Sequence, residues 1–264
     1  MKFDRAAQTY DADFTNTPIG RLQRNLVLSY VDAVLDKAPD LKILELNAGT
    51  GEDAIHFAAK GYSVSATDIS AKMLDNAETK AEDFGLSGLI QIIRCDMREI
   101  ANQDLQMEYD IVFSNFGGLN CLSPSEIEKL SEDVLFLLKP GGRFIAVVMP
   151  QYCFWESLYF LLKGKSREVF RRNSNESIPV RVEGETVKTW YYSPARFYRL
   201  MKKNFRKVKL QPIGFFIPPS YLGPAFDKKR DLLKFLGKLD RVIRVIPFLA
   251  SYSDHFLIDL ERVN

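Results

Sequence analysis

The sequence predicts an α/β protein built on a doubly wound, mostly parallel sheet, with an antiparallel strand pair added at the C-terminal end. Three observations support this fold class. Short apolar segments alternate with helical segments through residues 41–150, a glycine-containing turn follows the first of these strands, and two more strands frame a long insertion near the end of the chain. Ligands in such sheets bind outside the carboxyl ends of the strands, so strand-end residues are the candidates for function.

The first 150 residues account for the alternating pattern. Apolar residues recur at helical spacing from Leu22 to Leu35, after a break at Thr17-Pro18, and Pro39-Asp40 is expected to end this helix. The predicted strands are Lys42–Leu46, Ser63–Thr67, Ile90–Arg94, Tyr109–Phe113 and Arg143–Met149, the last after a turn at Pro140-Gly141-Gly142. The predicted helices between them are Asp53–Lys60, a helix from the cap Ser70 to about Phe84, and Pro124–Leu138 with Ser123 as its cap.

The pattern loosens after residue 150. Helices are predicted at Tyr152–Leu162, Pro194–Lys203 (capped by Ser193) and Asp231–Ile246. Strands are predicted at Val180–Trp190, with a turn at Glu183-Gly184, at Arg206–Ile217 and at Asp254–Glu261. The last two form the antiparallel pair, with residues 218–250 inserted between them.

Composition excludes several classes of protein. The chain has 264 residues, 46% of them hydrophobic and 27% charged, which is typical of a globular protein and not of a disordered one. No apolar run approaches the roughly 18 residues that a membrane span needs, and the first residues do not resemble a secretory signal. Three cysteines without paired spacing and two histidines predict a reducing, cytoplasmic location and no metal site.

The strand ends carry the most informative residues. Gly49 and Gly51 allow a sharp turn and a close approach of a ligand after the first strand, and Asn47 tolerates the positive φ that such a loop requires. Asp68 ends the second strand, where its carboxylate can accept two hydrogen bonds from a ribose diol. Asp96 ends the third strand and can accept a bond from a purine amine. The neighbouring Ile69 and Met97 can contact the ring on its faces.

Two nucleotide ligands satisfy this pattern. The spacing Gly49-x-Gly51-x-x-Ala54 also fits a dinucleotide fingerprint, in which the loop holds a pyrophosphate. Glu45 inside the first strand, the acid Asp96 and the turn Pro140-Gly141-Gly142 favour a different ligand.

In these residues the sequence resembles class I S-adenosylmethionine-dependent methyltransferases. The matching segments, which cover residues 42–150, are ILELNAGTGEDAIHFAAKGYSVSATDIS, IIRCDM, YDIVFSNFGGLNCL and LKPGGRFIAVVMP. The resemblance implies a Rossmann-like seven-stranded sheet that binds S-adenosylmethionine. The residues that it implies at the cofactor are Glu45, Asn47, Ala48, Gly49 and Gly51 near the methionine, Asp68 at the ribose, Asp96 with Met97 at the adenine, and Asn115 and Phe116 beside the reactive methyl. Ile69 and Met73 are also expected to bind the cofactor. The family usually has glycine where this chain has Asn47.

The N-terminal segment also resembles small-molecule members of this family. Residues 3–7 with Tyr10-Asp11 are similar to the opening helix of quinone-pathway and malonyl-carrier-protein methyltransferases, which folds over the cofactor. This similarity implies Tyr10 at the sulfonium and Arg21 or Arg24 at the cofactor carboxylate. The alternative is a surface helix in which Tyr10 packs on the sheet and the arginines are solvated.

We therefore expect a single methyltransferase domain over residues 1–264. Residues 1–40 form its helical cover, 41–150 its cofactor-binding core, and 151–193 and 218–250 its acceptor cap segments. The expected reaction is in-line methyl transfer to a small or lipid-like acceptor. An NAD-type oxidoreductase and a non-catalytic S-adenosylmethionine-binding protein are the alternatives. No catalytic residue is assigned, because His255 and His56 are expected to be packing or capping residues more often than bases.

Charge separates the two halves of the chain. Residues 1–150 carry a net charge of −9 and residues 151–264 a net charge of +11, and 20 of the 32 aromatic residues lie in the second half. An acceptor with an apolar body and an anionic end would suit the cap segments. Between Asp231 and Ile246, the stripe Leu232, Leu236, Leu239, Ile243 and Ile246 is expected to dock on the domain. Peripheral membrane contact is the less favoured alternative, nucleic acid ranks lower because no binding module is recognisable, and the oligomeric state is not predicted.

Overall fold

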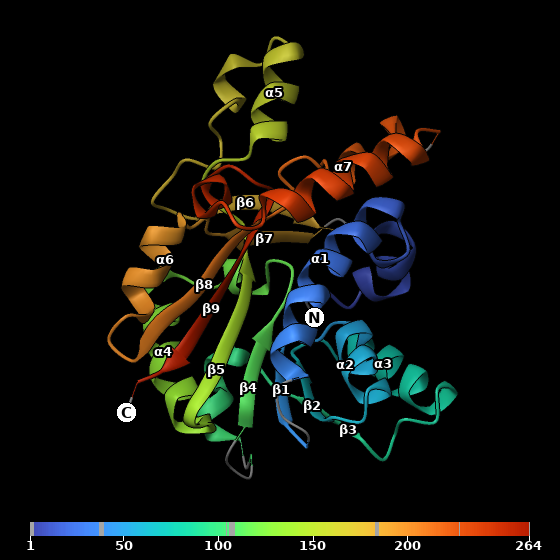
Figure 1. The fold of residues 1–264 in the computed structure, drawn as a ribbon, viewed down its shortest axis with the longest axis vertical. Coiled ribbons are helices and arrows are strands. Elements are labelled where there is room, and N and C mark those ends of the chain that lie inside the picture. The colour runs from blue at the N-terminus through green and yellow to red at the C-terminus, as the bar shows by residue number, and fades with distance from the viewer. Residues whose placement is uncertain are drawn as a thin grey trace.

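A seven-stranded sheet forms the centre of the molecule, with strand order β3-β2-β1-β4-β5-β9-β8 (Figure 1). β1 to β5 run parallel, and β9 lies antiparallel to both β5 and β8. The strands are β1 (Lys42–Leu46), β2 (Ser63–Asp68), β3 (Ile90–Arg94), β4 (Tyr109–Ser114), β5 (Leu138–Val148), β8 (Phe205–Ile213) and β9 (His255–Arg262). This arrangement confirms the predicted α/β class and the antiparallel C-terminal pair.

Residues 3–36, 40–103, 105, 109–182, 185–226 and 228–263 are described by this computed structural model. A separate antiparallel hairpin consists of β6 (Ile178–Val182) and β7 (Glu185–Thr189). The helices are α1 (Pro18–Leu35), α2 (Glu52–Ala59), α3 (Ala71–Asp83), α4 (Pro124–Leu137), α5 (Phe154–Leu162), α6 (Pro194–Met201) and α7 (Arg230–Ile243). The predicted helix stop at Pro39 and the predicted turn at Glu183-Gly184 lie outside the described residues.

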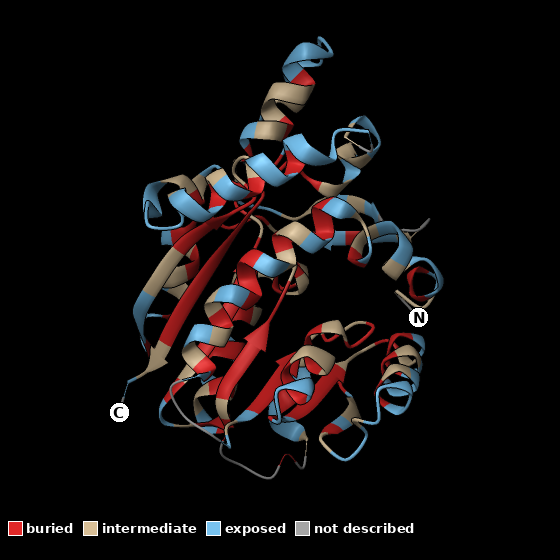
Figure 2. Cartoon of the chain, turned by 45° about the vertical axis from the view of Figure 1, so that its right-hand side comes forward, coloured by how far each residue is buried: buried red, intermediate tan, exposed pale blue. Residues whose placement is uncertain are grey.

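Helices cover both faces of the sheet. Apolar side chains of α1 and α2 pack with residues such as Ile43 and Phe113 on one face, and those of α4 and α6 pack with residues such as Phe144 on the other. The strands between these layers are buried along most of their length, whereas the helices turn exposed surfaces outward (Figure 2). The sheet is therefore doubly wound, as the alternating pattern predicts.

Hydroxyl side chains begin four of the helices. Thr17, Ser70, Ser123 and Ser193 each accept a hydrogen bond from the backbone N–H three residues further on. Ser123 also forms a reciprocal capping box with Glu126. The three predicted serine caps are confirmed, and with them the starts of α3, α4 and α6.

The edge strand β8 ends earlier than predicted. It stops at Ile213 instead of Ile217, since Gly214 has a φ of +70° and turns the chain away from β9. The carboxylate of Asp240 in α7 then accepts hydrogen bonds from the N–H groups of Phe215, Phe216 and Ile217 at 3.2, 2.9 and 2.9 Å. These donors are therefore satisfied by a side chain from the insertion and not by a neighbouring strand.

The apolar stripe predicted between residues 232 and 246 was expected to dock on the domain, and this expectation is wrong at both ends of the stripe. The buried residues of the helix are Leu233, Gly237 and Asp240, which lie toward α1 and β8. Leu232 and Ile246 of the predicted stripe are each 43% exposed. The apolar arc of the helix is wider than the face that packs against the protein.

Candidate active site

A cavity of about 580 Å³ lies at the carboxyl ends of the parallel strands. Its walls include ten of the fourteen residues expected at the cofactor: Tyr10, Asn47, Gly49, Asp68, Ile69, Met73, Asp96, Met97, Asn115 and Phe116. Arg24, Glu45, Ala48 and Gly51 do not line it. We call this space the first cavity.

The loop after β1 has the left-handed backbone that its sequence predicts. Asn47, Gly49 and Gly51 have φ values of +49°, +56° and +77°. A side chain added at Gly49 would meet no atom within 4 Å, so the loop leaves this position open to the first cavity. A Cβ at Gly51 would instead lie 2.7 Å from Cβ of Ala77. Gly51 therefore permits α2 to pack against α3, and Gly49 is the position that a ligand can approach.

Asn47 joins this loop to the loop after β4. Its Nδ2 donates to the carbonyl of Asn115 at 2.9 Å, and its Oδ1 accepts from the Ser114 hydroxyl at 2.6 Å. A Cβ on Gly118 would lie 2.2 Å from Cγ of Asn47. The asparagine that replaces the usual glycine thus occupies space that only a glycine at position 118 leaves free.

Asp68 is held in place by the backbone. Its Oδ2 accepts from the N–H of Gly49 and its Oδ1 from the N–H of Ser70, both at 2.9 Å. Burial raises the pKa of Asp68 above its ordinary value, although these bonds act in the opposite direction. A carboxylate has about four acceptor positions, so each oxygen retains one that can accept a hydrogen bond from a ligand.

Asp96 begins a 3₁₀ turn (Met97–Asn102) at the far end of the first cavity. Its oxygens accept from the backbone N–H and the guanidinium of Arg98 at 3.0 and 2.8 Å. Arg98 also donates to Glu126 in α4 at 2.8 Å. A ligand amine at this end would share the Asp96 carboxylate with Arg98.

A buried group of charges lies behind the glycine loop. Arg24 of α1 forms an ion pair with Asp53 of α2 at 2.5 Å. Burial and the nearby Asp53 raise the pKa of Glu45 well above its usual range. Among the described residues, Oε2 of Glu45 and Nε of Arg24 are buried without a hydrogen-bond partner. One buried carboxyl oxygen and one buried N–H donor are therefore left without a hydrogen bond in this part of the site.

The N-terminal segment is bound across the first cavity. Phe3 and Tyr10 line that cavity, and burial raises the pKa of Tyr10 to about 12. The segment is attached by hydrogen bonds from Ser70 to Asp4 and from Thr50 to Asp11, both at 2.6 Å. Arg21 points elsewhere and binds Asn16 at 2.9 Å. Of the two arginines considered for the cofactor carboxylate, only Arg24 is in the interior.

A second cavity of about 340 Å³ adjoins the first. Three residues, Tyr10, Phe116 and Met149, belong to the walls of both. Phe116 has a φ of +43°, an unusual conformation for a residue with a side chain. Strain of this kind concentrates at functional sites. Phe116 in the shared wall is therefore a candidate functional residue.

His255 lines the second cavity, whereas His56 does not line either one. Nδ1 of His255 lies 3.3 Å from Oδ2 of Asp254, and its ring meets that of Phe116 edge to face with centroids 5.5 Å apart. His56 lies in α2 and contacts Asp32 at 2.9 Å. The structure thus confirms a structural partner for His56 and places His255 at the wall of a cavity.

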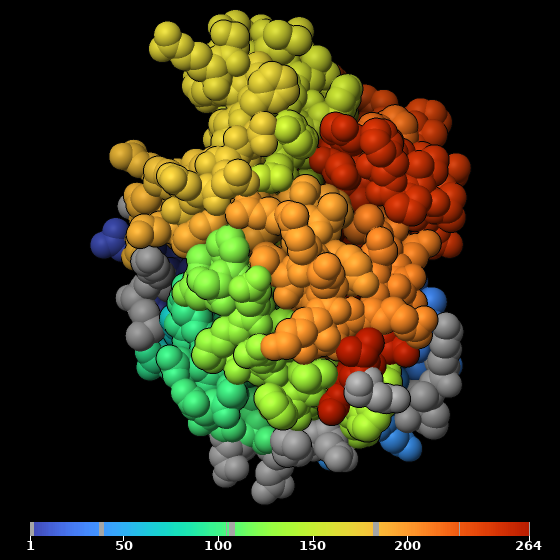
Figure 3. Space-filling model, turned by 90° about the vertical axis from the view of Figure 1, so that its left-hand side faces the viewer, coloured from blue at the N-terminus to red at the C-terminus, as the bar shows by residue number. Residues whose placement is uncertain are grey.

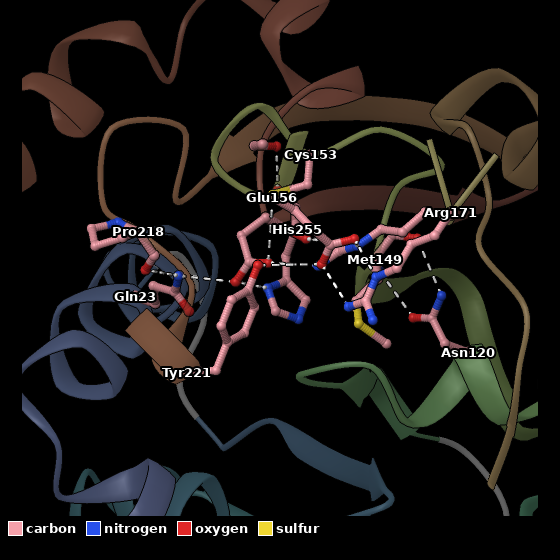
Figure 4. Close-up of polar contacts among 12 residues, drawn as sticks. Gln23, Asn120, Met149, Cys153, Glu156, Arg171, Pro218, Tyr221 and His255 are labelled. Atoms are coloured by element: carbon pink, nitrogen blue, oxygen red, sulfur yellow. Dashed lines mark hydrogen bonds and ion pairs between the residues drawn. The ribbon is translucent and has the colours of Figure 1, made fainter. Parts of the chain in front are cut away.

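A network of ion pairs and hydrogen bonds includes Arg172 and Asp254, which line the second cavity (Figure 4). Arg171 and Arg172 both donate to Glu156 of α5, at distances between 2.8 and 3.1 Å, and Arg172 also reaches Asp254 at 3.3 Å. Gln23 of α1 donates to the same Asp254 at 3.2 Å. Burial alone would raise the pKa of Asp254, but His255, Arg172 and Gln23 lower it to about 2.

Several wall residues carry no local signal in the sequence. The hairpin β6–β7 and the chain after it bring Val187, Trp190 and Tyr191 to the first cavity, while Arg172 and Tyr221 reach the second. Asn120 fixes this arrangement, because its side chain donates to the carbonyls of Met149 and Trp190 at 3.1 and 2.6 Å. Both predicted cap segments thus contribute to the cavity walls.

Two other kinds of site were sought in the part of the chain that the structure describes. No group of three or more histidine, cysteine or acidic side chains there is arranged to hold a metal ion. No helix within the same residues is long and apolar enough to cross a bilayer.

The sheet order, the glycine loop and the acids at successive strand ends are those expected of a class I S-adenosylmethionine-dependent methyltransferase domain. A family model described as a methyltransferase domain matches residues 43–142. These results favour a methyltransferase over an NAD-type oxidoreductase.

Relatives of known name agree on this class and differ in acceptor. The tRNA 5-carboxymethoxyuridine methyltransferase of Escherichia coli is 31% identical over 112 residues, which are 42% of each chain. The demethylmenaquinone methyltransferase of Paenarthrobacter aurescens is 27% identical over 194 residues, 71% of this chain and 70% of the relative. The structure of magnesium protoporphyrin IX methyltransferase from Synechocystis PCC 6803, with bound SAH, shares the fold at a TM-score of 0.59 and 17% identity, and the match covers 93% of this chain and 86% of that one. The chain thus spans less than half of the length of the first of these relatives.

Proposed function

We propose that the protein transfers a methyl group from S-adenosylmethionine in the first cavity to a small or lipid-like acceptor in the second. The observation that carries this proposal is the shared wall of Tyr10, Phe116 and Met149 between the two cavities. When bound, S-adenosylmethionine supplies an electrophilic methyl group on a sulfonium. The task of the chain is then to hold two molecules in line, which accounts for most of the catalysis in a displacement of this kind.

The nucleoside end of the cofactor fits the acids of the first cavity. The two acceptor positions that Asp68 retains match the two hydroxyls of a ribose. Asp96 would accept from the adenine amine, with Ile69 and Met97 as apolar contacts for the ring. Met73 lies in the same wall.

The amino-acid end fits the buried charges behind the glycine loop. The unsatisfied Oε2 of Glu45 suits an ammonium group, and the unsatisfied Nε of Arg24 suits a carboxylate. A methionine moiety carries both groups on one carbon. We therefore assign these two residues to that end, although they lie behind the cavity wall.

The second cavity combines apolar and polar walls. Phe14, Phe116 and Pro219 are apolar, while Arg172 and His255 offer polar groups. Such a space suits an acceptor with an apolar ring or chain and a polar end, and a quinone of the kind named for the Paenarthrobacter relative has this character. The tRNA methyltransferase relative and the basic C-terminal half make a tRNA nucleoside the second candidate.

Cofactor binding can be tested by calorimetry with S-adenosylhomocysteine. Asp68→Ala should weaken binding about 100-fold or more, because two hydrogen bonds to a charged group are lost. The matched control Asp75→Ala removes an exposed carboxylate of α3 and should bind as the native protein does. Unchanged affinity of Asp68→Ala for S-adenosylhomocysteine would overturn the proposal. Binding of NADH by a protein that does not bind S-adenosylhomocysteine would overturn it as well.

Turnover separates an enzyme from a protein that only holds the cofactor. Labelled S-adenosylmethionine is incubated with a reduced naphthoquinone and, separately, with total tRNA. Label in the quinol supports a small acceptor, label in tRNA supports the second candidate, and label in neither supports binding alone. His255→Asn should reduce kcat about 100-fold where the acceptor loses a proton, with the affinity for S-adenosylhomocysteine unchanged.

A further inference from the structure

Helix α7 has three distinct faces, of which only one packs against the protein. Leu233, Gly237 and Asp240 form the buried face. Gly237 allows close packing, since a Cβ there would lie 3.3 Å from Leu22 of α1. Asp240 binds the backbone of residues 215–217, as described above. This face attaches the helix firmly to α1 and to the end of β8.

The second face is apolar and turned away from the protein. We define the apolar stripe of α7 as Leu232, Phe235, Leu239 and Val242, whose spacing of three and four residues places them on one side of the helix. Phe235 is 55%, Val242 70% and Leu232 43% exposed, whereas Leu239 is half-buried. A helix in water normally buries its apolar side, so this stripe lacks a partner among the described residues.

The third face is basic. Arg230, Lys234, Lys238 and Arg241 follow one another at intervals of four, four and three residues. All four are exposed. The acids of α7 offset these charges only in part: Asp231 pairs with Lys234 at 3.4 Å, and Asp240 is buried against backbone N–H groups. The surface of α7 is therefore cationic beside its apolar stripe.

A cluster of aromatic residues, two of them largely exposed, includes residues that follow α7 in the chain. Phe248, 68% exposed, meets Tyr252 at a centroid distance of 5.2 Å, and Tyr252 meets Tyr152 at 6.2 Å. Phe170, 63% exposed, follows at 6.4 Å from Tyr152. Figure 3 shows the C-terminal part of the chain in red, next to the base of the projecting region that contains α5. Exposed apolar residues that gather in this way mark a site of contact.

We propose that α7 rests on the surface of an anionic phospholipid membrane, with the apolar stripe in the acyl boundary and the basic face among the lipid phosphates. Apolar side chains beside charges of one sign are the combination that such a helix requires. A nucleic acid would bind the basic face and leave Phe235 and Val242 in water. It would therefore explain the basic face but not the exposed apolar stripe. The proposal does not depend on the identity of the methyl acceptor.

Vesicle co-sedimentation tests this assignment on the full chain. The protein should sediment with phosphatidylcholine vesicles that contain 30% phosphatidylserine and not with pure phosphatidylcholine, and binding should fall in 500 mM salt. Phe235→Ser with Val242→Ser should weaken binding at least tenfold. Lys234→Gln with Lys238→Gln should weaken it by about fivefold per lysine removed.

Matched controls use equally exposed residues elsewhere. Phe84→Ser with Phe136→Ser removes two aromatic rings that are 67% and 68% exposed, and Lys42→Gln with Lys202→Gln removes two exposed charges. Both controls should bind vesicles as the native protein does.

Three results would overturn the proposal. The first is no sedimentation with anionic vesicles. The second is equal loss of binding in the controls. The third is a dimer that becomes monomeric in Phe235→Ser with Val242→Ser, measured by ultracentrifugation without lipid, because the stripe would then join two copies of the chain.

Discussion

Substitution of Gly118 by alanine tests the contact between the two loops of the first cavity. The added Cβ would lie 2.2 Å from Cγ of Asn47 and 2.5 Å from its Oδ1 and Nδ2. To move away, Asn47 must give up its bonds to Asn115 and Ser114, which contribute about 0.5–1.5 kcal/mol each. Overpacking that is not relieved costs about 1–3 kcal/mol. We expect Gly118→Ala to lower the free energy of unfolding by about 2–4 kcal/mol.

A double-mutant cycle isolates the contact. Asn47→Gly loses the same two hydrogen bonds. It also removes the backbone strain of an asparagine in the left-handed conformation, so it should lower the free energy of unfolding by only about 1 kcal/mol. With Asn47 already replaced, Gly118→Ala is freed from the three nearest atoms and should cost little, which corresponds to a coupling energy of about 2–4 kcal/mol. Urea unfolding followed by circular dichroism measures all four proteins, provided that the m-value stays constant.

The control for this cycle is Gly88→Ala. Its Cβ would meet nothing within 4 Å, and its φ is not positive, so stability should stay the same or rise by less than about 1 kcal/mol. If Gly118→Ala cost the same free energy with and without Asn47, the two residues would not be in contact and our account of the loop would be wrong.

Two further predictions concern stability. Partners lower the pKa values of Glu156 and Asp254 in the folded protein. Their contribution to stability is therefore present above their ordinary pKa values and should be lost as the pH falls from about 4.5 to about 2, measured by urea unfolding at several pH values. Arg172→Met should cost about 3–5 kcal/mol near neutral pH and flatten this dependence. Gly51→Ala should cost more than Gly49→Ala in thermal unfolding, by about 1–3 kcal/mol, because both have a positive φ but only Gly51 would press on Ala77. Equal costs would remove the packing role assigned to Gly51.

The core elements were predictable because local signals agree there. β1 and β3 begin and end at the predicted residues, and the serine caps of α3, α4 and α6 bind the predicted backbone groups. Turn glycines were harder to interpret. β5 begins at Leu138 and includes Pro140-Gly141-Gly142, with a register shift against β4, where a turn before the strand was expected.

The features that the sequence could not predict depend on contacts between residues far apart in the chain. The end of β8 depends on Asp240, more than twenty residues away, and the second cavity depends on Arg172, Tyr221 and His255 from three separate segments. The predicted stripe of residues 232–246 shares Leu232 and Leu239 with the apolar stripe of α7 but omits the exposed Phe235 and Val242, and periodicity does not say whether an apolar face has a partner. Gln23 of α1 illustrates the same limit, since its bond to Asp254 spans most of the chain.

The position of β8 at the edge of the sheet has a consequence for how copies of the protein behave at high concentration. An edge strand with free backbone groups can recruit a strand from another molecule. β8 pairs only with β9, and it carries Arg206 and Lys207 next to a register shift, with Pro212 further along. Charge, an irregular register and a missing N–H donor each oppose the addition of a strand. The antiparallel pair that completes the sheet therefore also opposes the addition of a further strand at this edge.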